Sequence, residues 1–297
     1  MNVLEYFPCR IGQVIKENLS EEELNVLEEI RIRCCRPIVL KLRNNDKILN
    51  YIISTQDILE IVEKITENSM YSYQKQLCSG YITLKGGHRV GISGNVVMEE
   101  DKVININYIY SLNFRIARQI IGVSEKILSE VINNDNIYNT LIVSPPGAGK
   151  TTILRDLIRN ISREKTVGVV DERGEITAMY KNEPQNDMGL KVDILSNVSK
   201  SIGMKMLVRS MAPDIICADE IGTKEDIEAI KYAITSGVKG IYTAHGESIE
   251  SINKSPILKE LLELNIINKV IILNKEDRSK IDVIKLWNQK WFYSFLF

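Results

Sequence analysis

The chain has 297 residues, of which 44% are hydrophobic and 26% charged, and its 38 basic residues nearly balance its 39 acidic ones. This composition is typical of a folded globular protein with one large or two modest domains, and it excludes extensive disorder. The balanced charge gives no sign of a nucleic-acid partner, and none is expected, although a local basic patch would not show in that total.

The cysteines and histidines do not have the spacing of a metal site. The chain has two histidines and five cysteines, at positions 9, 34, 35, 78 and 217, with no CxxC pair. An odd number of cysteines and no secretory leader predict free thiols in a reducing cytosol. Because no apolar run approaches 18 residues, no membrane span is expected. We therefore expect a cytoplasmic protein that is at most peripherally associated with a membrane.

Residues 1–120 are predicted to form a small α+β domain. Strands are expected at 30–33, 38–40, 47–53, 81–84 and 88–97, the last two joined as a hairpin by Gly86 and Gly87. Helices are expected at 20–29 and 55–67, the first with Ser20 as its N-cap and Glu23 completing a capping box.

Residues 121–297 are predicted to form a second, α/β domain. Strands are expected at 139–144, 166–171, 214–218 and 239–244, and helices at 124–132, 150–161, 200–211 and 224–236. This alternation indicates a parallel sheet with crossover helices.

A phosphate-binding loop of the Walker A type follows the first strand of this domain. It consists of Ser144, Pro145, Pro146, Gly147, Ala148, Gly149, Lys150, Thr151 and Thr152. A glycine-containing loop that opens onto a helix N-terminus supplies convergent N–H donors for the phosphates of ATP. Lys150 would contact the β- and γ-phosphates, and the Thr151 hydroxyl would bind Mg²⁺. Ser144 replaces the usual first glycine, for which we expect a modest cost, since the later amides contact the phosphates.

A Walker B arrangement lies downstream, where an apolar strand ends in Asp219 and Glu220. Asp219 is expected to hold Mg²⁺ or its water, and Glu220 to polarise the water that attacks the γ-phosphate. Two adjacent acidic residues after a strand can also cap the next helix. The phosphate loop favours the catalytic interpretation.

Two further polar groups follow strands of the same predicted sheet. Asp171 and Glu172 come after the strand at 166–171, and His245 comes after the strand at 239–244. A catalytic glutamate beside the Walker B aspartate implies an additional-strand P-loop fold, in which the strand at 239–244 lies between the two Walker strands. His245 would then face the γ-phosphate as a sensor; the alternative is a structural histidine. Glu172 either orients water or metal, or lies in a solvated loop.

These motifs resemble a known family. The second half is similar to the secretion and pilus-motor branch of RecA-like P-loop ATPases, in which an acidic box follows the second strand and a histidine box the fourth. The whole chain resembles the stage III sporulation protein AA family of endospore-forming bacteria at 29–33, 36–37, 80–83, 86–91, 113–118, 170–176 and 209–222. The resemblance implies a RecA-like fold and a probable hexamer of identical chains. It also implies docking on an integral membrane component of the complex between mother cell and forespore, on the mother-cell side. The secretion motors usually end their Walker B strand in Gly-Glu, whereas Asp219 precedes Glu220 here, which weakens the mechanical analogy.

Arginines are weighed separately, because ring ATPases often complete each site with a cation from the neighbouring subunit. Arg89, Arg115 and Arg118 match positions at which secretion motors carry such cations, and Arg209 lies just before the Walker B strand. The Walker motifs contain no arginine of their own. We expect a donor within this set, although each member alone is more often an ordinary ion-pair residue.

The expected function is therefore an energy-coupling ATPase of a transport or channel complex in sporulation, with ATP and Mg²⁺ as its ligands. One alternative is a RecA-like ATPase stimulated by nucleic acid, which requires a basic groove bearing aromatic side chains. The other is a nucleotide-binding scaffold with little turnover, which the replacement at Ser144 makes conceivable.

Overall fold

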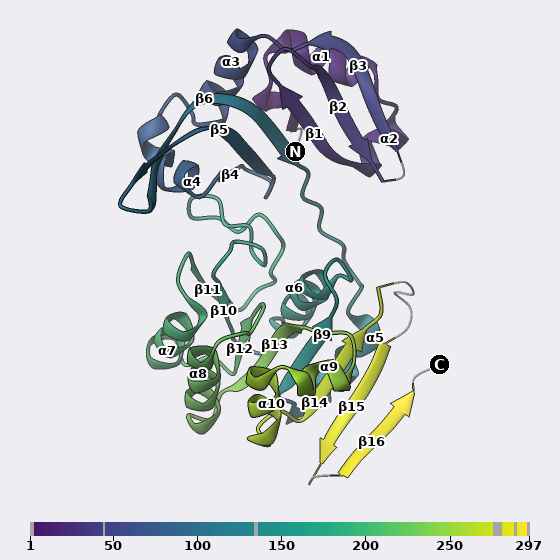
Figure 1. The fold of residues 1–297 in the computed structure, drawn as a ribbon. Coiled ribbons are helices and arrows are strands. Elements are labelled where there is room, and N and C mark those ends of the chain that lie inside the picture. The colour runs from purple at the N-terminus through teal and green to yellow at the C-terminus, as the bar shows by residue number, and fades with distance from the viewer. Residues whose placement is uncertain (1–2, 44, 134–135, 276–280, 288–289, 296–297) are drawn as a thin grey trace. The chain divides into compact units, whose positions relative to one another are not determined.

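The computed structural model describes residues 3–43, 45–133, 136–275, 281–287 and 290–295. The chain forms two compact units, Met1–Arg118 with Ala178–Gln185, and Gln119–Thr177 with Asn186–Phe297 (Figure 1). The first division lies close to the boundary expected after residue 120. The sequence placed Ala178–Gln185 in the second domain, but the structure groups this segment with the first unit.

The first unit contains a six-stranded antiparallel sheet in the order β3-β2-β1-β6-β5-β4. Its strands are β1 (Leu27–Arg33), β2 (Pro37–Leu42), β3 (Asp46–Ile52), β4 (Tyr81–Thr83), β5 (Arg89–Glu99) and β6 (Lys102–Arg115). Its helices are η1 (Val3–Tyr6), α1 (Cys9–Glu17), α2 (Glu21–Val26), α3 (Thr55–Ile65), η2 (Met70–Tyr73) and α4 (Gln74–Cys78). Apolar side chains of these helices and of the sheet form one buried core, in which the rings of Phe7 and Phe114 lie 4.5 Å apart.

The expected helix at 20–29 is wrong in its second part. The capping box of Ser20 and Glu23 is present, but α2 ends at Val26. From Leu27 the chain pairs with β2, and β6 pairs along the other edge of β1. Sheet pairing on both sides therefore overrides the helical pattern of these residues.

The segment Ala178–Gln185 is fixed to the first unit by side-chain hydrogen bonds. The Tyr180 hydroxyl donates to Glu67, and the Lys181 amine lies 3.0 Å from the same carboxylate. The amide of Gly86 donates to the side-chain oxygen of Gln185 at 2.6 Å. The segment is therefore an integral part of this unit.

The second unit contains an eight-stranded sheet in the order β11-β10-β12-β13-β9-β14-β15-β16. Its strands are β9 (Thr140–Ser144), β10 (Val167–Asp171), β11 (Val192–Ser196), β12 (Ile215–Ala218), β13 (Lys239–His245), β14 (Lys269–Leu273), β15 (Ile281–Trp287) and β16 (Lys290–Phe295). Strands β9 to β14 pair in parallel, and β15 pairs antiparallel with both β14 and β16. Strands β7 (Ile132–Asn133) and β8 (Asn136–Ile137) form a separate pair. The prediction that β13 lies between the Walker strands β9 and β12 is confirmed.

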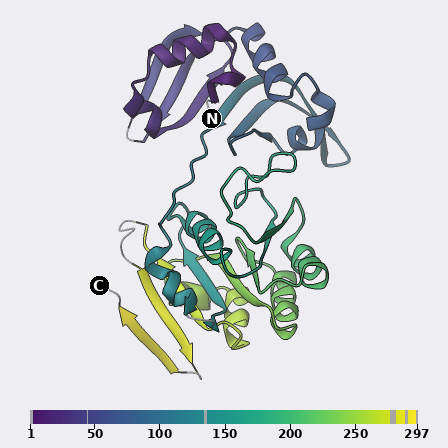
Figure 2. The same ribbon diagram turned by 180° about the vertical axis from the view of Figure 1, so that it is seen from behind.

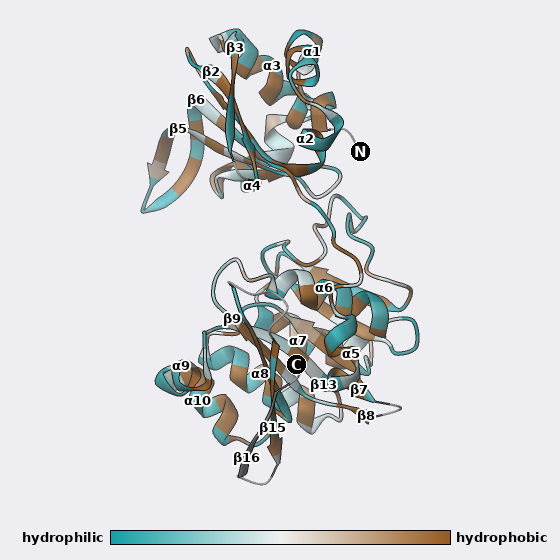
Figure 3. Cartoon of the chain, turned by 90° about the vertical axis from the view of Figure 1, so that its right-hand side faces the viewer, coloured by the Kyte–Doolittle hydropathy of each residue, from teal (hydrophilic) through white to brown (hydrophobic). Residues whose placement is uncertain are grey.

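Helices cover both faces of this sheet. They are α5 (Glu125–Val131), α6 (Lys150–Ile161), α7 (Lys200–Ser210), α8 (Lys224–Thr235), α9 (Ile249–Lys254) and α10 (Pro256–Glu263). Alternate strand residues pack against α5 and α6 on one face and against α7 to α10 on the other (Figures 1 and 2). The apolar strands of this layered α/β unit are brown in Figure 3. Among the described residues, no helix has the length and hydropathy needed to span a membrane.

Candidate nucleotide site

The phosphate loop connects β9 to α6 at the carboxyl end of the parallel strands. Gly147 and Gly149 have φ angles of +80° and +96°, in the left-handed region that favours glycine. An added Cβ would meet no other atom within 4 Å at either position. Lys150 begins α6 and its side chain is only 8% exposed. A glycine-containing loop that opens onto a helix N-terminus in this way suits a phosphate group.

Ser144 occupies a position that does not require glycine. It is the last residue of β9, is fully buried and pairs with His245 of β13, so its backbone is extended. Its hydroxyl donates to the Pro145 carbonyl at 3.0 Å, and its own carbonyl accepts from the Gly246 amide at 3.2 Å. A side chain is accommodated here, and the left-handed positions of the loop lie later, at residues that are still glycine.

Hydroxyl groups hold both Walker B residues, Asp219 through its carboxylate and Glu220 through its backbone amide. Asp219 accepts from the Thr151 hydroxyl at 2.6 Å and also from the Thr243 hydroxyl. The Thr243 oxygen in turn accepts from the backbone amide of Glu220 at 2.8 Å. Glu220 has a φ of +56°, which is uncommon for a residue with a side chain and is typical of strained functional positions. Thr243, buried on β13, therefore fixes both acidic residues, and the sequence did not single it out.

Three cationic or titratable groups surround the Glu220 carboxylate. One oxygen lies 3.4 Å from the Lys150 amine and 3.0 Å from His245 Nε2, and the other contacts the Arg173 guanidinium. His245 Nδ1 also lies 3.4 Å from the Lys150 amine. Burial raises the pKa of Glu220, but Lys150, Arg173 and His245 outweigh it, so the pKa is lowered overall. His245 is thus in contact with both Glu220 and Lys150.

The residues present fit a magnesium ion that is shared with phosphate. Thr151 and Asp219 supply a hydroxyl and a carboxylate side by side, the oxygen ligands that Mg²⁺ takes together with substrate phosphates. Burial raises the pKa of Asp219 despite the hydrogen bonds from Thr151 and Thr243. In the described part of the chain no cluster of three or more His, Cys, Asp or Glu side chains could hold a metal alone.

The acidic loop after β10 is organised around Asp171. Asp171 is buried and accepts from the amides of Glu175, Ile176 and Thr177. Glu172 forms an ion pair with Lys200 of α7. The structure brings Arg173 of the same loop to Glu220. The signal for Arg173 was its place just beyond the carboxyl end of a parallel strand.

The four arginines chosen from the sequence do not join this cluster within the second unit. Arg209 lies near the end of α7, which precedes the amino end of β12, and its guanidinium stacks 5.6 Å from the Tyr232 ring. Within its own chain, Arg209 therefore lies on the amino-end side of β12, and its role as a donor to a neighbouring subunit stays a prediction. The other three belong to the first unit. Arg89 stacks on Tyr81 at 5.0 Å, Arg118 donates to backbone carbonyls, and Arg115 is exposed.

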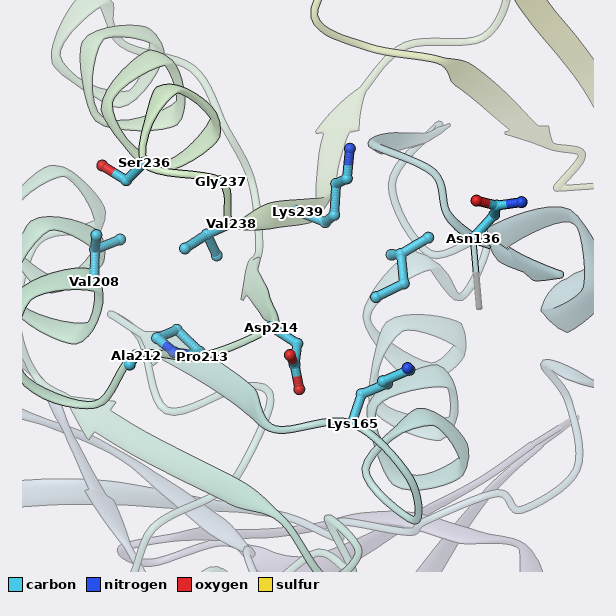
Figure 4. Close-up of a pocket in the computed structure, with 11 residues that line it drawn as sticks. Asn136, Lys165, Val208, Ala212, Pro213, Asp214, Ser236, Gly237, Val238 and Lys239 are labelled. Carbon is cyan, nitrogen blue, oxygen red and sulfur yellow. The ribbon is translucent and has the colours of Figure 1, made fainter. Parts of the chain in front are cut away.

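A separate pocket of about 590 Å³ opens at the amino ends of the parallel strands, opposite the phosphate loop. It is lined by residues at the amino ends of the strands, including Lys165, Asp214 and Lys239 (Figure 4). Since the Walker residues lie at the carboxyl ends, this pocket does not belong to the nucleotide site.

Comparison with known proteins decides the family. The model of the family described as sporulation stage III, protein AA, matches residues 2–291. The chain belongs to this family. It is 38% identical over 279 residues to stage III sporulation protein AA of Bacillus subtilis, covering 92% of this chain and 90% of that protein. It is also 26% identical over 263 residues to an uncharacterized protein, ycf45, of Porphyra purpurea, covering 88% of this chain and 43% of that protein.

Solved structures with a similar fold include an ATPase and a pilus motor. The ATPase DotB of Legionella pneumophila matches with a TM-score of 0.60 at 15% identity, over 95% of this chain and 82% of DotB. The pilus retraction motor PilT, solved with bound ADP, matches with a TM-score of 0.58 at 14% identity, over 92% of this chain and 78% of PilT. The RecA-like α/β fold expected for this member of the sporulation family is confirmed.

Proposed function

We propose that the chain is an ATPase that couples Mg²⁺-dependent ATP hydrolysis to the work of a membrane-associated transport or channel complex in sporulation. The observation that carries this proposal is the meeting of Lys150, Thr151, Asp219, Glu220 and His245 at the carboxyl ends of three adjacent parallel strands. This edge is where open parallel sheets bind ligands. The similarity of the fold to the ATPase DotB and the pilus retraction motor PilT, and membership of the sporulation family, support the same assignment.

Each side chain has a defined task in this reaction. The loop amides and Lys150 bind the phosphates, and Thr151 and Asp219 hold the Mg²⁺ ion, which neutralises phosphate charge when bound. Glu220 accepts a proton from water as the water oxygen bonds to the γ-phosphorus. The bond from that phosphorus to the bridging oxygen breaks, and its electron pair leaves with ADP. His245, in contact with both Lys150 and Glu220, senses whether the γ-phosphate is present.

The proposal extends to assembly and location. By the likeness to secretion motors, identical chains are proposed to form a hexameric ring in the cytoplasm on the mother-cell side, bound to an integral membrane protein. Arg89, Arg115 or Arg118 of one subunit is proposed to reach the nucleotide of the next. Mixing Glu220→Gln subunits with Arg89→Ala or Arg115→Ala subunits tests this, because two inactive proteins should regain turnover together.

The test of the activity compares three variants for phosphate release and nucleotide binding. Glu220→Gln should keep ATP affinity but lose about a hundredfold or more in turnover, because general base catalysis contributes about 10² to 10⁴. Lys150→Ala should weaken nucleotide binding itself. Glu225→Gln, a change of an exposed carboxylate on α8, is the control and should retain full turnover. Normal hydrolysis by Glu220→Gln excludes this residue as the base. Stimulation of the parent by single-stranded DNA or RNA would favour a nucleic-acid-dependent ATPase instead.

A further inference from the structure

The loop after β10 carries an arginine into the nucleotide site of its own chain. Resting on the proposed ATPase function, we propose that Arg173 is a cation for the γ-phosphate supplied in cis, which binds Glu220 in the nucleotide-free state and transfers to the terminal phosphate when ATP binds. Arg173 and Glu220 belong to the same compact unit, and β10 and β12, the strands before them, are parallel neighbours. This residue adds to the catalytic set a cation that requires no second subunit.

The backbone beneath Arg173 is fixed at several points. The buried Asp171 carboxylate accepts from the amides of Glu175 at 2.8 Å and Thr177 at 2.8 Å, which closes the loop on itself. Arg155 of α6 donates to the carbonyls of Glu175 at 2.8 Å and Ile176 at 2.9 Å. Because α6 begins with the phosphate-binding Lys150, the loop is attached to the helix that holds the nucleotide. The start of the Arg173 side chain is therefore positioned relative to the phosphates.

The Arg173 side chain is the more exposed member of its ion pair with Glu220. It is 64% exposed, whereas the Glu220 side chain it contacts is 19% exposed. Its guanidinium bonds one oxygen of the carboxylate whose other oxygen lies 3.4 Å from the Lys150 amine. Lys150 is the group that contacts the β- and γ-phosphates in a loop of this type. Only the Glu220 carboxylate therefore separates the Arg173 guanidinium from the group expected to bind the γ-phosphate.

Charge gives the direction of the exchange. In the structure each Glu220 oxygen contacts a cationic or imidazole group. A terminal phosphate offers a planar guanidinium more negative charge and the geometry for two parallel hydrogen bonds. When Arg173 turns to that phosphate, one Glu220 oxygen is released to accept a hydrogen bond from the attacking water. ADP lacks the phosphate and leaves the pair in place.

The experiment measures nucleotide affinity in the full-length chain with Mg²⁺ present. Arg173→Ala should bind ADP within about twofold of the parent, but bind a nonhydrolysable ATP analogue about tenfold more weakly, equivalent to about 1.4 kcal/mol. Arg173→Lys should recover part of the loss. Arg163→Ala removes an exposed arginine just beyond the far end of α6 and should change neither affinity. Because Arg173 is largely exposed, these variants should keep the melting temperature of the parent.

Repeating the measurement in the Glu220→Gln protein shows whether Arg173 contacts the phosphate directly or changes nucleotide affinity through Glu220. In the Glu220→Gln protein, the loss caused by Arg173→Ala should be as large or larger, since the competing carboxylate is gone. A loss that disappears in this background overturns the inference, as does an Arg173→Ala protein with the analogue-to-ADP affinity ratio of the parent. A parent chain that binds neither nucleotide overturns the proposed function and this inference together.

Discussion

Replacing Ser144 by glycine, which restores the usual first residue of the phosphate loop, should weaken the fold and leave nucleotide binding unchanged. Ser144→Ala removes the hydroxyl that donates to Pro145, at a cost of about 1 kcal/mol. Ser144→Gly also frees the backbone of an extended, buried strand residue, which adds about 0.5–1 kcal/mol. The total of about 1.5–2 kcal/mol should lower the melting temperature of the second unit by about 3–8 °C.

The assay is thermal unfolding of the full-length chain with and without ADP, together with a binding titration. The transition that ADP raises belongs to the unit that binds it, so the two units can be told apart. Both variants should bind ADP within about twofold of the parent, because the amides facing the phosphate lie later in the loop. A Ser144→Gly protein that is more stable than the parent, or that binds ADP tenfold more tightly, refutes the reasoning and shows that serine impairs the loop.

Three further predictions concern buried polar groups. Thr243→Val keeps the shape of the side chain but leaves the Asp219 carboxylate and the Glu220 amide without their shared hydroxyl. In urea unfolding this change should cost about 2–4 kcal/mol of stability, against about 1 kcal/mol for Thr243→Ser. Equal losses of stability in the two variants contradict this role. Burial is the main cause that lowers the pKa of His88, and its Nδ1 accepts from the Ala117 amide at 3.0 Å. As the pH falls, the histidine of the unfolded chain takes up a proton before that of the folded chain. The free energy of unfolding should therefore fall as the pH drops below about 6.5, and more steeply in the parent than in His88→Asn. The buried Tyr242 hydroxyl has no hydrogen-bond partner among the described residues, so Tyr242→Phe should stabilise the chain by about 1 kcal/mol, and a clear loss in denaturant unfolding contradicts this.

The sequence predicts the centre of the second unit well because its strands are buried on both faces. Such strands are short continuous apolar runs, and the phosphate loop fixes which strand comes first. The edges were missed: β11 and β14 to β16 were not predicted, nor was the long strand β6, which pairs with the adjacent β5 and with the distant β1. Arg173 and Thr243 were missed for a related reason. Their roles depend on which strands are neighbours and on their register, and neither is written in a local pattern.

The discontinuous first unit has a consequence for biosynthesis. The ribosome completes Met1–Arg118 before it reaches Ala178–Gln185, so residues 119–177, about 60 residues, separate the two parts of one folded body. At about 5–20 residues per second this interval is on the order of 10 s, far longer than small domains need to collapse. During that interval Glu67 and the Gly86 amide are without the partners they have in the finished protein. The first unit is therefore complete only after the ribosome has synthesised a segment that lies within the sequence of the second unit. A shortened chain that ends before Gln185 has an incomplete first unit.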